Sequence, residues 1–559
     1  MTVTSPFPDR EIPTVDLTTF VFEQAQARVD AAAALQMDEP VLMVDGVTGH
    51  GLSFSDIRKQ SLAVARGLSD RGFTSKCEDY QTAVVFAPVS IYFSVIHFGT
   101  LMAGGVYAAF DPDLSHATLA KRLMEVNAAA VFTSAELLPT LLAACESAKL
   151  TLEPSNIILI SGNCSGYETL SSLCKKSSQD SSFEPYVIRY LDEQERKVAN
   201  IVYTSGTTGD GKGVMLTHRN LIAAHKILGG NFFNSYTNAR ELAAERQKRR
   251  YMLSALPLWF HYGHCVLCYQ PLISGDCIVQ LPSFNLPEYM DTLERYHVER
   301  IFSTPRLLHS LLTGTAKSDE RTAAIGGSPA RSYDIGSVKA IVCGGATLPD
   351  CHRRRASAYF GGATITIGYG QSETCGVIAG CVLKKPAPGA VGVLYPGLTA
   401  KVVDEHGQET TAFGDLCIAG PTVMKGYAGR SEPPVDKDGF LHTGDYARVD
   451  AGGSVFLSGR MTDIIPTTHG PVSPTGIEDI LFEHPSVEDC AVVGQMLNGL
   501  EQPVAFVVLA ADARSVPGCM DGIEVWLREK AGLEVVCREI SGIPKSPAGK
   551  VLRNMFKQA

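Results

Sequence analysis

A run of glycine, hydroxyl and lysine residues follows a predicted buried strand at Val198–Tyr203. The run reads Thr204-Ser205-Gly206-Thr207-Thr208-Gly209-Asp210-Gly211-Lys212. Glycines let backbone N–H groups approach phosphate oxygens closely, hydroxyls add donors, and the lysine supplies a positive charge. A flexible linker seldom follows a buried strand with these residues. The segment therefore predicts a loop that holds the phosphates of a nucleotide.

A P-loop of the kinase and GTPase type is the sharper alternative for this segment. Gly206, Gly211 and Lys212 satisfy the G-x-x-x-x-G-K part of that signature, but Gly213 replaces the Ser or Thr that would bind magnesium. The next residues, 214–218, indicate a further strand and a turn, whereas a P-loop leads into a helix. Both observations argue against a P-loop.

Further motifs follow in the order found in the adenylate-forming superfamily, and the segment at 204–212 resembles the phosphate loop of that family. The family includes acyl-CoA synthetases, coumarate–CoA ligases, beetle luciferases and the adenylation domains of peptide synthetases. The resemblance runs from about residue 20 to the end, with the spacing of the coumarate–CoA ligase branch. The matching segments are the acyl-tunnel motif at 256–263, the adenine turn at 344–347, the aromatic-and-carboxylate motif at 368–374, the ribose motif at 442–445, the hinge at 459–463 and the lysine motif at 544–550.

The resemblance implies catalytic roles for Lys550, Lys212 and Glu373. Attack of a carboxylate on the α-phosphate of ATP joins two anions and expels pyrophosphate, so catalysis needs positive charge and positioning. Lys550 would bridge the carboxylate and the α-phosphate region, and Lys212 would hold the departing phosphates. Glu373 would bind Mg²⁺, a cation that prefers oxygen ligands.

The resemblance also implies a set of nucleotide contacts. Tyr369 would present its flat face to adenine, Asp445 would accept both ribose hydroxyls, and Arg460 would donate to the ribose. The full set of expected ATP- and AMP-binding residues is Thr204, Ser205, Gly206, Thr207, Thr208, Gly209, Lys212, Gly344, Gly345, Ala346, Gly368, Tyr369, Gly370, Ser372, Asp445, Arg460 and Lys550.

The acyl-tunnel motif departs from the family pattern. Phe260 occupies the position that usually holds histidine, and His261 comes one residue later. The expected acyl-binding residues are Phe260, His261, Tyr262, Ser303, Thr304 and Gly344. Their apolar surroundings favour an aryl or medium-chain acid.

A zinc site is a second possibility for the same segment, because His261, His264, Cys265 and Cys268 form H-x-x-H-C-x-x-C. Structural zinc normally takes its four ligands from two separated pairs. Here all four lie close together among apolar residues. A buried helix start beside the acyl tunnel is the preferred interpretation.

The loop after the hinge also departs from the family pattern. The resemblance implies that this loop lines the coenzyme A channel. Residues 466–469 replace the common Lys-x-x-Gly, with Gly470 one place late, and Gly476 stands where Glu is common. We expect ATP, Mg²⁺ and CoA to be used with a carboxylic acid. Transfer to the phosphopantetheine of a carrier protein, a luciferase-like oxygenase and a non-catalytic nucleotide-binding relative remain alternatives; the intact lysine and carboxylate motifs argue against the last.

Alternating strand-like and helix-like runs predict an α/β fold. The resemblance implies a region at 1–458 with two α/β subdomains and a distorted β-barrel, a hinge at 459–463 with Asp463 as its pivot, and a small mobile α+β domain at 464–559. Two stretches, 161–182 and 313–332, are predicted to be surface loops or disordered insertions. An apolar stretch at 81–110 is predicted to form strand Thr82–Phe86, helix Ser90–Met102 and strand Val106–Ala109, and not a membrane span.

Composition limits the remaining possibilities. The formal charge of −10 argues against a general nucleic-acid binder. The fifteen cysteines have no regular spacing, and the chain shows neither a signal peptide nor a peroxisomal Ser-Lys-Leu ending. These features favour reduced thiols and a cytoplasmic location.

Overall fold

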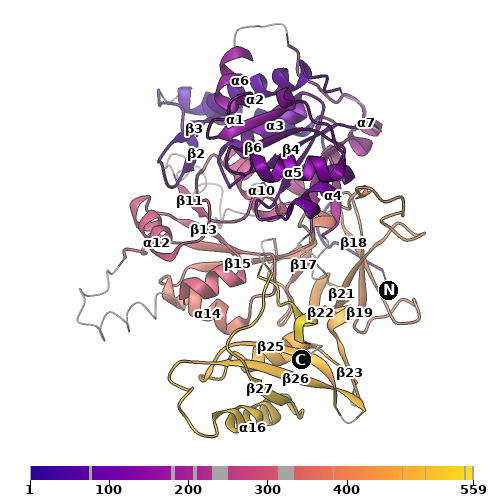
Figure 1. Cartoon of the computed structure of the whole chain (residues 1–559). Coiled ribbons are helices and arrows are strands. Elements are labelled where there is room, and N and C mark those ends of the chain that lie inside the picture. Colours follow the sequence, from indigo (N-terminus) through magenta and orange to yellow (C-terminus); the bar gives the residue numbers. More distant parts are fainter. Residues whose placement is uncertain are drawn as a thin grey trace, which may run out of the picture.

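Two large sheets and a separate small one form the framework of the computed structural model (Figure 1). The structure describes residues 2–34, 36–74, 79–177, 183–204, 211–228, 250–312, 333–381, 383–468, 470–497, 499–546 and 549–556. The predicted α/β class is confirmed. The predicted insertion at 313–332 lies outside the described residues.

The first sheet has eight strands, and most of them are parallel. Their order is β20 (Gly426–Tyr427), β10 (Gly213–Thr217), β9 (Val198–Tyr203), β5 (Val106–Phe110), β4 (Thr82–Phe86), β6 (Ala128–Ser134), β7 (Ile157–Ser161) and β8 (Glu168–Thr169). Strand β10 runs antiparallel to β9 and β20. The helices of this region are α1 (Leu17–Ala34), α2 (Phe54–Ser69), α3 (Tyr92–Met102), α4 (His116–Glu125), α5 (Leu138–Ala148), α6 (Leu170–Ser177), α7 (Leu191–Arg196) and α8 (His218–Leu228).

The second sheet has fourteen strands and changes character along its width. Its parallel part comprises β2 (Val41–Asp45), β12 (Cys277–Gln280), β11 (Tyr251–Ser254), β13 (Arg300–Ser303), β14 (Ala340–Cys343) and β15 (Thr364–Tyr369), with β3 (Gly51–Ser53) at the edge. Its antiparallel part comprises β16 (Ala379–Gly380), β17 (Gly392–Leu394), β22 (Ser454–Arg460), β21 (Leu441–Val449), β19 (Gly414–Ala419), β18 (Thr399–Val403) and β1 (Val3–Thr4). The stretch expected to form a distorted barrel thus continues the same sheet.

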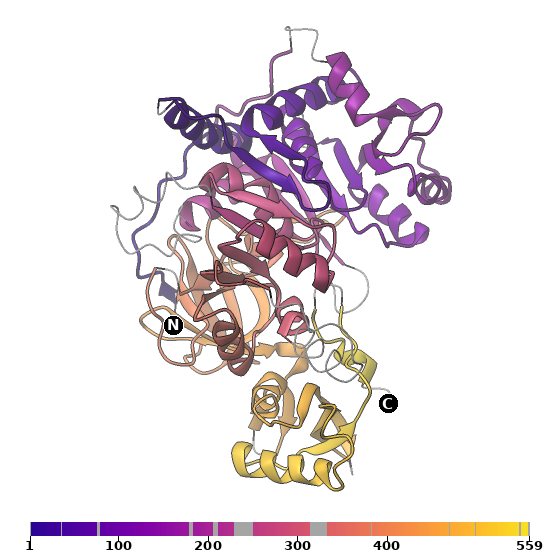
Figure 2. The same cartoon turned by 90° about the vertical axis from the view of Figure 1, so that its left-hand side faces the viewer.

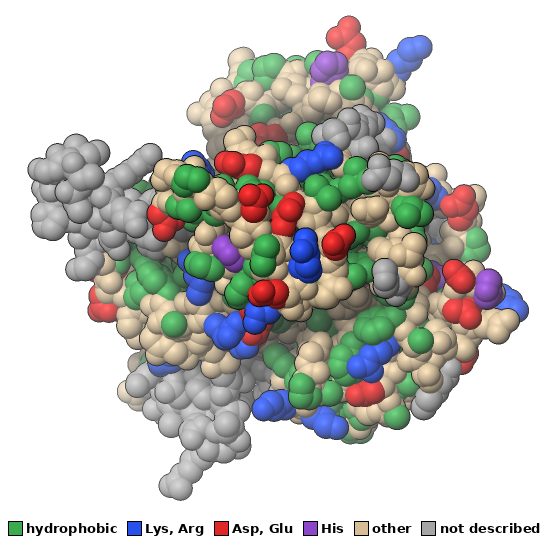
Figure 3. Space-filling model, turned by 90° about the horizontal axis from the view of Figure 1, so that it is seen from below, with side chains coloured by type: hydrophobic (Ala, Val, Ile, Leu, Met, Phe, Trp, Pro, Cys, Tyr) green, Lys and Arg blue, Asp and Glu red, His purple; other side chains and the backbone are tan. Residues whose placement is uncertain are grey.

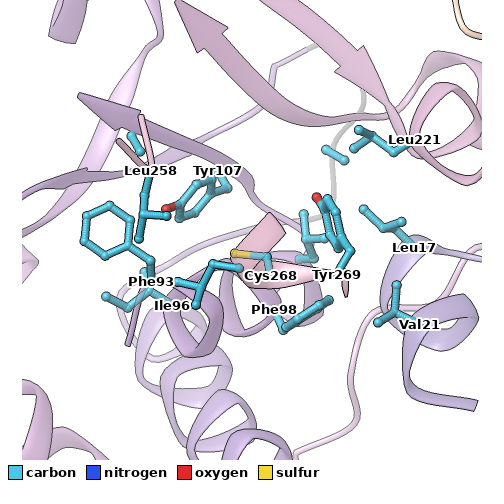
Figure 4. Packing of buried hydrophobic residues seen from close by; sticks show 14 of the residues in the cluster. Leu17, Val21, Phe93, Ile96, Phe98, Tyr107, Leu221, Leu258, Cys268 and Tyr269 are labelled. Carbon is cyan, nitrogen blue, oxygen red and sulfur yellow. The ribbon is translucent and has the colours of Figure 1, made fainter. Parts of the chain in front are cut away.

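Several helices of the described residues accompany the parallel part of the second sheet. They include α10 (His261–Cys268), α11 (Gln270–Ser274), α12 (Leu286–Arg295) and α14 (Asp350–Tyr359). Helix α10 packs against the core of the first region: Figure 4 shows Cys268 and Tyr269 among Leu17, Val21, Phe93, Ile96, Phe98, Tyr107, Leu221 and Leu258. This packing fixes the helix that carries the acyl-tunnel motif.

The small C-terminal part lies at one end of the molecule (Figure 2) and has its own core of apolar side chains. It contains β23 (Ile465–Thr467), β24 (Gly470–Val472), α15 (Pro474–Leu481), β25 (Val487–Leu497), β26 (Leu500–Leu509), α16 (Cys519–Ala531) and β27 (Val536–Glu539). Acidic, basic and apolar side chains are mixed on the face of the molecule seen from this end (Figure 3). The predicted hinge, 459–463, spans the end of β22 and the short helix η3 (Met461–Asp463).

Two sequence predictions outside the site have clear outcomes. The apolar stretch forms β4, α3 and β5, as predicted, and no helix within the described residues has the length and apolar character needed to cross a membrane. The prediction of a loop at 161–182 was wrong over 168–177, which form β8 and α6. Leu170 and Leu173 are almost fully buried in the main core, and this spaced apolar pair was hidden by the serine-rich composition.

Candidate active site

A cavity of about 490 Å³ lies beside the carboxyl ends of the parallel strands of the second sheet. Pro257, Ser283, Thr304, Gly344 and Gly370, which follow five of those strands in turn, line it. Ligands of open α/β sheets bind at this edge because the loops after parallel strands converge there. The fold therefore brings segments far apart in sequence to one wall.

The base of the predicted phosphate loop closes between β9 and β10. The N–H of Thr204 donates to the carbonyl of Lys212 (3.0 Å), and the N–H of Lys212 donates to Oγ1 of Thr204 (3.1 Å). A Cβ at Gly211 would lie 2.3 Å from the carbonyl oxygen of Thr204, so a side chain cannot be accommodated there. Ser205, Gly206, Thr207, Thr208 and Gly209 lie outside the described residues.

The direction of β10 excludes the P-loop alternative. A P-loop leads into a helix whose N-terminus faces the phosphates. Here residues 213–217 form a strand that pairs antiparallel with β9, with Val214 opposite Val202. The strands on either side of this segment are therefore an antiparallel pair, which the P-loop alternative does not allow.

Lys212 and Glu373 are linked through a tyrosine that the sequence motifs did not include. The ammonium of Lys212 lies 4.8 Å from the ring centroid of Tyr427, and the Tyr427 hydroxyl donates to Oε1 of Glu373 (3.0 Å). Burial, and then the negative charge of Glu373, raises the pKa of Tyr427, which keeps it a donor. Tyr427 reaches the site because β20 pairs with β10, a long-range contact that no local motif signals.

Asp445 is a buried carboxylate with three donors. The Tyr369 hydroxyl (2.6 Å) and the side-chain amide of Gln371 (2.7 Å) both donate to Oδ2, and Nε of Arg460 lies 3.1 Å from Oδ1. Burial and the Asp445 charge raise the pKa of Tyr369. Gln371 was not among the predicted residues, although it lies inside the aromatic-and-carboxylate motif.

These contacts limit how Asp445 can bind a ribose. An ionised carboxylate has about four acceptor positions, so three donors leave one position for two ribose hydroxyls. The Arg460 side chain is 44% exposed, whereas Tyr369 is almost fully buried. Arg460 is therefore the partner that can move aside and become a ribose donor itself.

Lys550 enters the cavity from the small C-terminal part. It lies in a tight turn in which the N–H of Ser546 donates to the carbonyl of Lys550 (2.8 Å) and the N–H of Lys550 donates to Oγ of Ser546 (3.1 Å). Burial and then the charge of Arg460 lower the pKa of Lys550, while Asp445 and Glu373 act in the opposite direction. These four predicted charged groups thus share one electrostatic environment.

Two arginines outside the predicted set hold this turn in place. Nη1 of Arg306, in the segment after β13, donates to the carbonyl of Ser546 (3.1 Å). Arg553 lies 3.0 Å from Oε2 of Glu478 through Nη2 and 3.4 Å from Oδ2 of the predicted hinge residue Asp463 through Nε. The turn that carries Lys550 is therefore tied to both the large region and the hinge.

Family models match most of the chain. The model described as "AMP-binding enzyme" matches residues 23–428, and "AMP-binding enzyme C-terminal domain" matches 476–550. The chain is an AMP-binding enzyme.

Named relatives span nearly the whole of this AMP-binding enzyme. "Peroxisomal OPC-8:0-CoA ligase 1" of Arabidopsis thaliana is 26% identical, covering 98% of this chain and 94% of the relative. "4-coumarate--CoA ligase 5" of Oryza sativa subsp. japonica is 28% identical, covering 98% and 95%. ATP-bound MatB from Rhodopseudomonas palustris has a similar fold, with a TM-score of 0.76 and 23% identity over 97% of this chain and 98% of MatB.

The acyl-tunnel motif forms the start of α10 in this AMP-binding enzyme. Phe260, His261 and Tyr262 line the cavity, and the Tyr262 hydroxyl donates to the carbonyl of Val342 (2.9 Å). Burial lowers the pKa of His261 to about 4, so its imidazole is neutral. Thr304 lines the same wall, whereas Ser303 is fully buried behind it.

Glycines shape the wall next to the predicted adenine turn. Gly344 and Gly345 line the cavity, and a Cβ at Gly344 would meet the Tyr262 ring at 3.7 Å. Gly345 has a φ of +90°, and Ala346 follows it directly. Gly368, Gly370 and Ser372 line the cavity from the end of β15. A Cβ at Gly370 would lie 2.2 Å from the backbone of Gly376, so only glycine fits there.

The histidines and cysteines of α10 do not converge on one point. His261 pairs with Cys265 on the cavity side (Nε2 to Sγ, 3.4 Å), and His264 pairs with Cys268 on the core side (Nδ1 to Sγ, 3.6 Å). Within the described part of the chain, these four residues do not form a metal-binding cluster. The preferred interpretation, a helix start beside the acyl cavity, agrees with this arrangement.

Proposed function

We propose that this AMP-binding enzyme uses ATP to convert a carboxylic acid into an acyl-adenylate and pyrophosphate, and then transfers the acyl group to coenzyme A with release of AMP. The observation that carries the proposal is that Lys550 lines the cavity, where the carboxylates of Asp445 and Glu373 act on its ammonium group. The relatives named as CoA ligases support the second step.

The first step needs positive charge and fixed geometry more than covalent chemistry. The carboxylate oxygen of the acid attacks the α-phosphorus, and the bond from that phosphorus to the oxygen of pyrophosphate breaks. The ammonium of Lys550 stabilises the negative charge around the α-phosphate, and Lys212 stabilises the departing pyrophosphate. Asp445 and Arg460 position the ribose, and the glycine-lined wall at Gly344 and Gly345 leaves room for adenine.

Glu373 offers a carboxylate oxygen of the kind that binds a magnesium ion in this reaction. Mg²⁺ is commonly held by one or two carboxylates together with substrate phosphates and water. Oε1 of Glu373 accepts from Tyr427, and Oε2 has no hydrogen bond to another described residue. The free oxygen can bind Mg²⁺, and the bound ion would neutralise charge on the phosphates.

The second step requires the small C-terminal part to move. Lys550 occupies the cavity in the present arrangement, so a thiol needs this turn to withdraw. We place the pivot at Asp463, in η3 between the two parts. The departures at Pro466, Gly470 and Gly476 lie in the β23–β24 hairpin and at the start of α15. The family lines its CoA channel with this segment. Because the segment differs in this chain, a carrier-protein thiol is the alternative acceptor.

A panel of carboxylic acids tests the proposal, assayed with ATP and Mg²⁺ in the presence and absence of CoA. Release of pyrophosphate with an acid, and a thioester that forms only with CoA, is the expected result. Pyrophosphate without any thioester would redirect the second step to a carrier protein. ATP binding without pyrophosphate release from any acid would instead support a non-catalytic role.

We also propose a cytoplasmic location. Localisation of the tagged protein to an organelle would contradict it.

Replacing Lys550 separates the two half-reactions. We expect Lys550→Ala to reduce pyrophosphate release on the order of 100-fold or more, because it removes a cation from the site of developing charge. Use of preformed acyl-AMP with CoA should be nearly unchanged. Lys437→Ala, which changes an exposed lysine, is the control. Equal loss of both half-reactions in Lys550→Ala would contradict the assigned role.

A further inference from the structure

Three side chains that can bind a metal ion converge beside the ribose motif, in the antiparallel part of the second sheet. Asp415 and Cys417 lie on β19, and His442 lies opposite Cys417 on the neighbouring strand β21 (Figure 1). Residues two apart on a strand point to the same face. One carboxylate oxygen, the thiol sulfur and one ring nitrogen of these residues all lie within 4.8 Å of one another. Within the described part of the chain, these three side chains therefore face one point.

The spacing and chemistry of the three groups suit zinc. Nδ1 of His442 lies 3.4 Å from Sγ of Cys417 and 2.7 Å from Oδ2 of Asp415. Tetrahedral zinc, with bonds of about 2.0–2.3 Å, holds its ligand atoms roughly 3.3–3.8 Å apart. The histidine and the thiol already have this separation, and the histidine and the carboxylate need to part by roughly 0.7 Å. A thiol and an imidazole favour zinc over magnesium, which prefers oxygen ligands.

Asp436 supplies the outer contact that a zinc-bound histidine normally has. Its Oδ2 lies 3.5 Å from Nε2 of His442. A metal-bound imidazole generally donates its other ring N–H to a carboxylate or carbonyl, which fixes the tautomer and the ring orientation. Nζ of Lys401 lies 2.9 Å from the same oxygen, so the charge of Asp436 is balanced within the protein. The histidine is thus held from behind with Nδ1 directed toward Asp415 and Cys417.

The charges of the site balance when zinc binds. Burial and then the charge of Asp415 raise the pKa of Cys417 to about 12, so the thiol carries its proton until zinc displaces it to solvent. The thiolate and the Asp415 carboxylate then neutralise the two charges of Zn²⁺, and His442 keeps its proton on Nε2. The side chains of His442 and Asp415 are 45% and 19% exposed, so the ion can enter from solvent and keep a water as its fourth ligand.

Asp415 also holds the ribose motif in place. Its Oδ1 accepts a hydrogen bond from the N–H of Gly444 (3.1 Å), the residue directly before Asp445. His442 belongs to the same motif, and the pairing of β19 with β21 shifts register at this point. An ion that parts Asp415 from His442 therefore acts on the segment that positions the ribose carboxylate.

We propose that Asp415, Cys417 and His442 form a zinc-binding site, with Asp436 as the outer partner of the imidazole, and that an ion bound there weakens the binding of ATP through the ribose motif. The site uses none of the residues assigned to magnesium or to the acyl group. Its metal binding does not depend on the proposed acid activation.

Titrations of the reduced, metal-free protein with Zn²⁺ and Co²⁺ test the site. Cobalt bound by a thiolate gives a charge-transfer band in the near ultraviolet. We expect the wild type to bind one equivalent of zinc more than Cys417→Ser and to show a cobalt–thiolate band that this variant lacks. His442→Asn, on the neighbouring strand, should weaken zinc binding by about tenfold or more, because it removes a ligand. Cys381→Ser removes an exposed thiol and should titrate as the wild type does. Thermal unfolding without metal shows that each variant is folded.

ATP binding in the presence of Mg²⁺, measured with and without zinc, tests the effect on the ribose motif. We expect zinc to raise the dissociation constant of ATP for the wild type by about threefold or more, since it displaces a group that hydrogen-bonds the ribose. Cys417→Ser should bind ATP equally well with and without zinc.

Equal zinc stoichiometry and an equal cobalt–thiolate band in the wild type and Cys417→Ser would overturn the site. Zinc binding that depends on Cys417 but leaves the ATP dissociation constant unchanged would overturn the effect on the ribose motif. Absence of pyrophosphate release with every acid would contradict the proposed function and leave the zinc site intact.

Discussion

At the scale of single residues, two carboxylates near the cavity differ in how far they are already engaged. Asp445 is buried and receives hydrogen bonds from Tyr369 and Gln371 as well as an ion pair from Arg460. Glu373 has the hydroxyl of Tyr427 as its donor among the described side chains. A carboxylate with a free oxygen can bind a metal ion, whereas one with three donors is suited to hold a fixed group. The geometry thus favours the roles that the motifs predict.

Magnesium dependence tests the role of Glu373. We expect Glu373→Gln to need at least about tenfold more Mg²⁺ for half-maximal pyrophosphate release, because an amide oxygen is a weaker ligand for a hard cation than a carboxylate. Titration with Mg²⁺ at saturating ATP measures the effect. Glu432→Gln, at an exposed position, should titrate as the wild type does. A wild-type titration curve for Glu373→Gln would remove this residue from the metal site.

At the scale of elements, the turn that carries Lys550 is held between two ion pairs. Lys545, before the turn, lies 2.6 Å from Asp489, and Arg553, after it, binds Glu478. These side chains are largely buried, so the pairs are screened less than surface pairs. The turn therefore belongs to the small part as a rigid unit. It meets the large region where Gly549 passes against Arg306.

Gly549 tests whether this close approach positions Lys550. Its φ is +84°, and a Cβ would lie 2.6 Å from Cβ of Arg306. Gly499→Ala is a matched control, because Gly499 has a φ of +80° but no atom within 4 Å of a built Cβ. We expect Gly549→Ala to lower acyl-AMP formation by about tenfold or more, because the added Cβ forces the turn to shift and the shift misplaces the Lys550 ammonium. Reaction of preformed acyl-AMP with CoA should remain near wild type, and equal activity of the two alanine variants in acyl-AMP formation would refute the positioning role.

At the scale of the whole molecule, the features that could be predicted from the sequence are those carried by short local motifs. The strand before the phosphate loop, the α/β class and the gathering of Asp445, Arg460 and Lys550 all follow motif order. Tyr427 and Arg306 were missed because they reach the site through strand pairing and packing between distant segments.

The contact between the two parts of the molecule is partly polar. Arg354 of α14 lies 3.3 Å from Glu483 just after α15, and both side chains are more than half exposed. Exposed ion pairs contribute about 0–1 kcal/mol. The rings of His352 and Phe482 pack at 4.6 Å in the same contact. Such an interface is compatible with the separation of the two parts that we propose for the second half-reaction.

The charge state of His352 should bias this separation. The residue is 5% exposed, and its pKa is lowered from 6.5 to about 4 by burial and then by His309 and Arg355; among its more distant neighbours, Asp489 raises the pKa and Lys545 lowers it. Separation would expose the imidazole and return its pKa toward 6.5. The separated state then binds more protons between these values, so the closed arrangement is fully favoured above pH 6.5 and loses stability as the pH falls toward 4.

Energy transfer between dyes on the large region and the small part measures this effect. In the wild type, protonation of His352 should disfavour the closed arrangement by up to roughly 3 kcal/mol in acid. Asp479 acts in the opposite sense, since its pKa is raised to about 6 by burial and by Glu478, Asp350 and Glu483. The informative quantity is therefore the difference between wild type and His352→Asn, which retains Asp479 and cannot take up the proton. We expect the variant to stay closed at lower pH than the wild type, and superimposable pH curves would show that His352 does not control the interface.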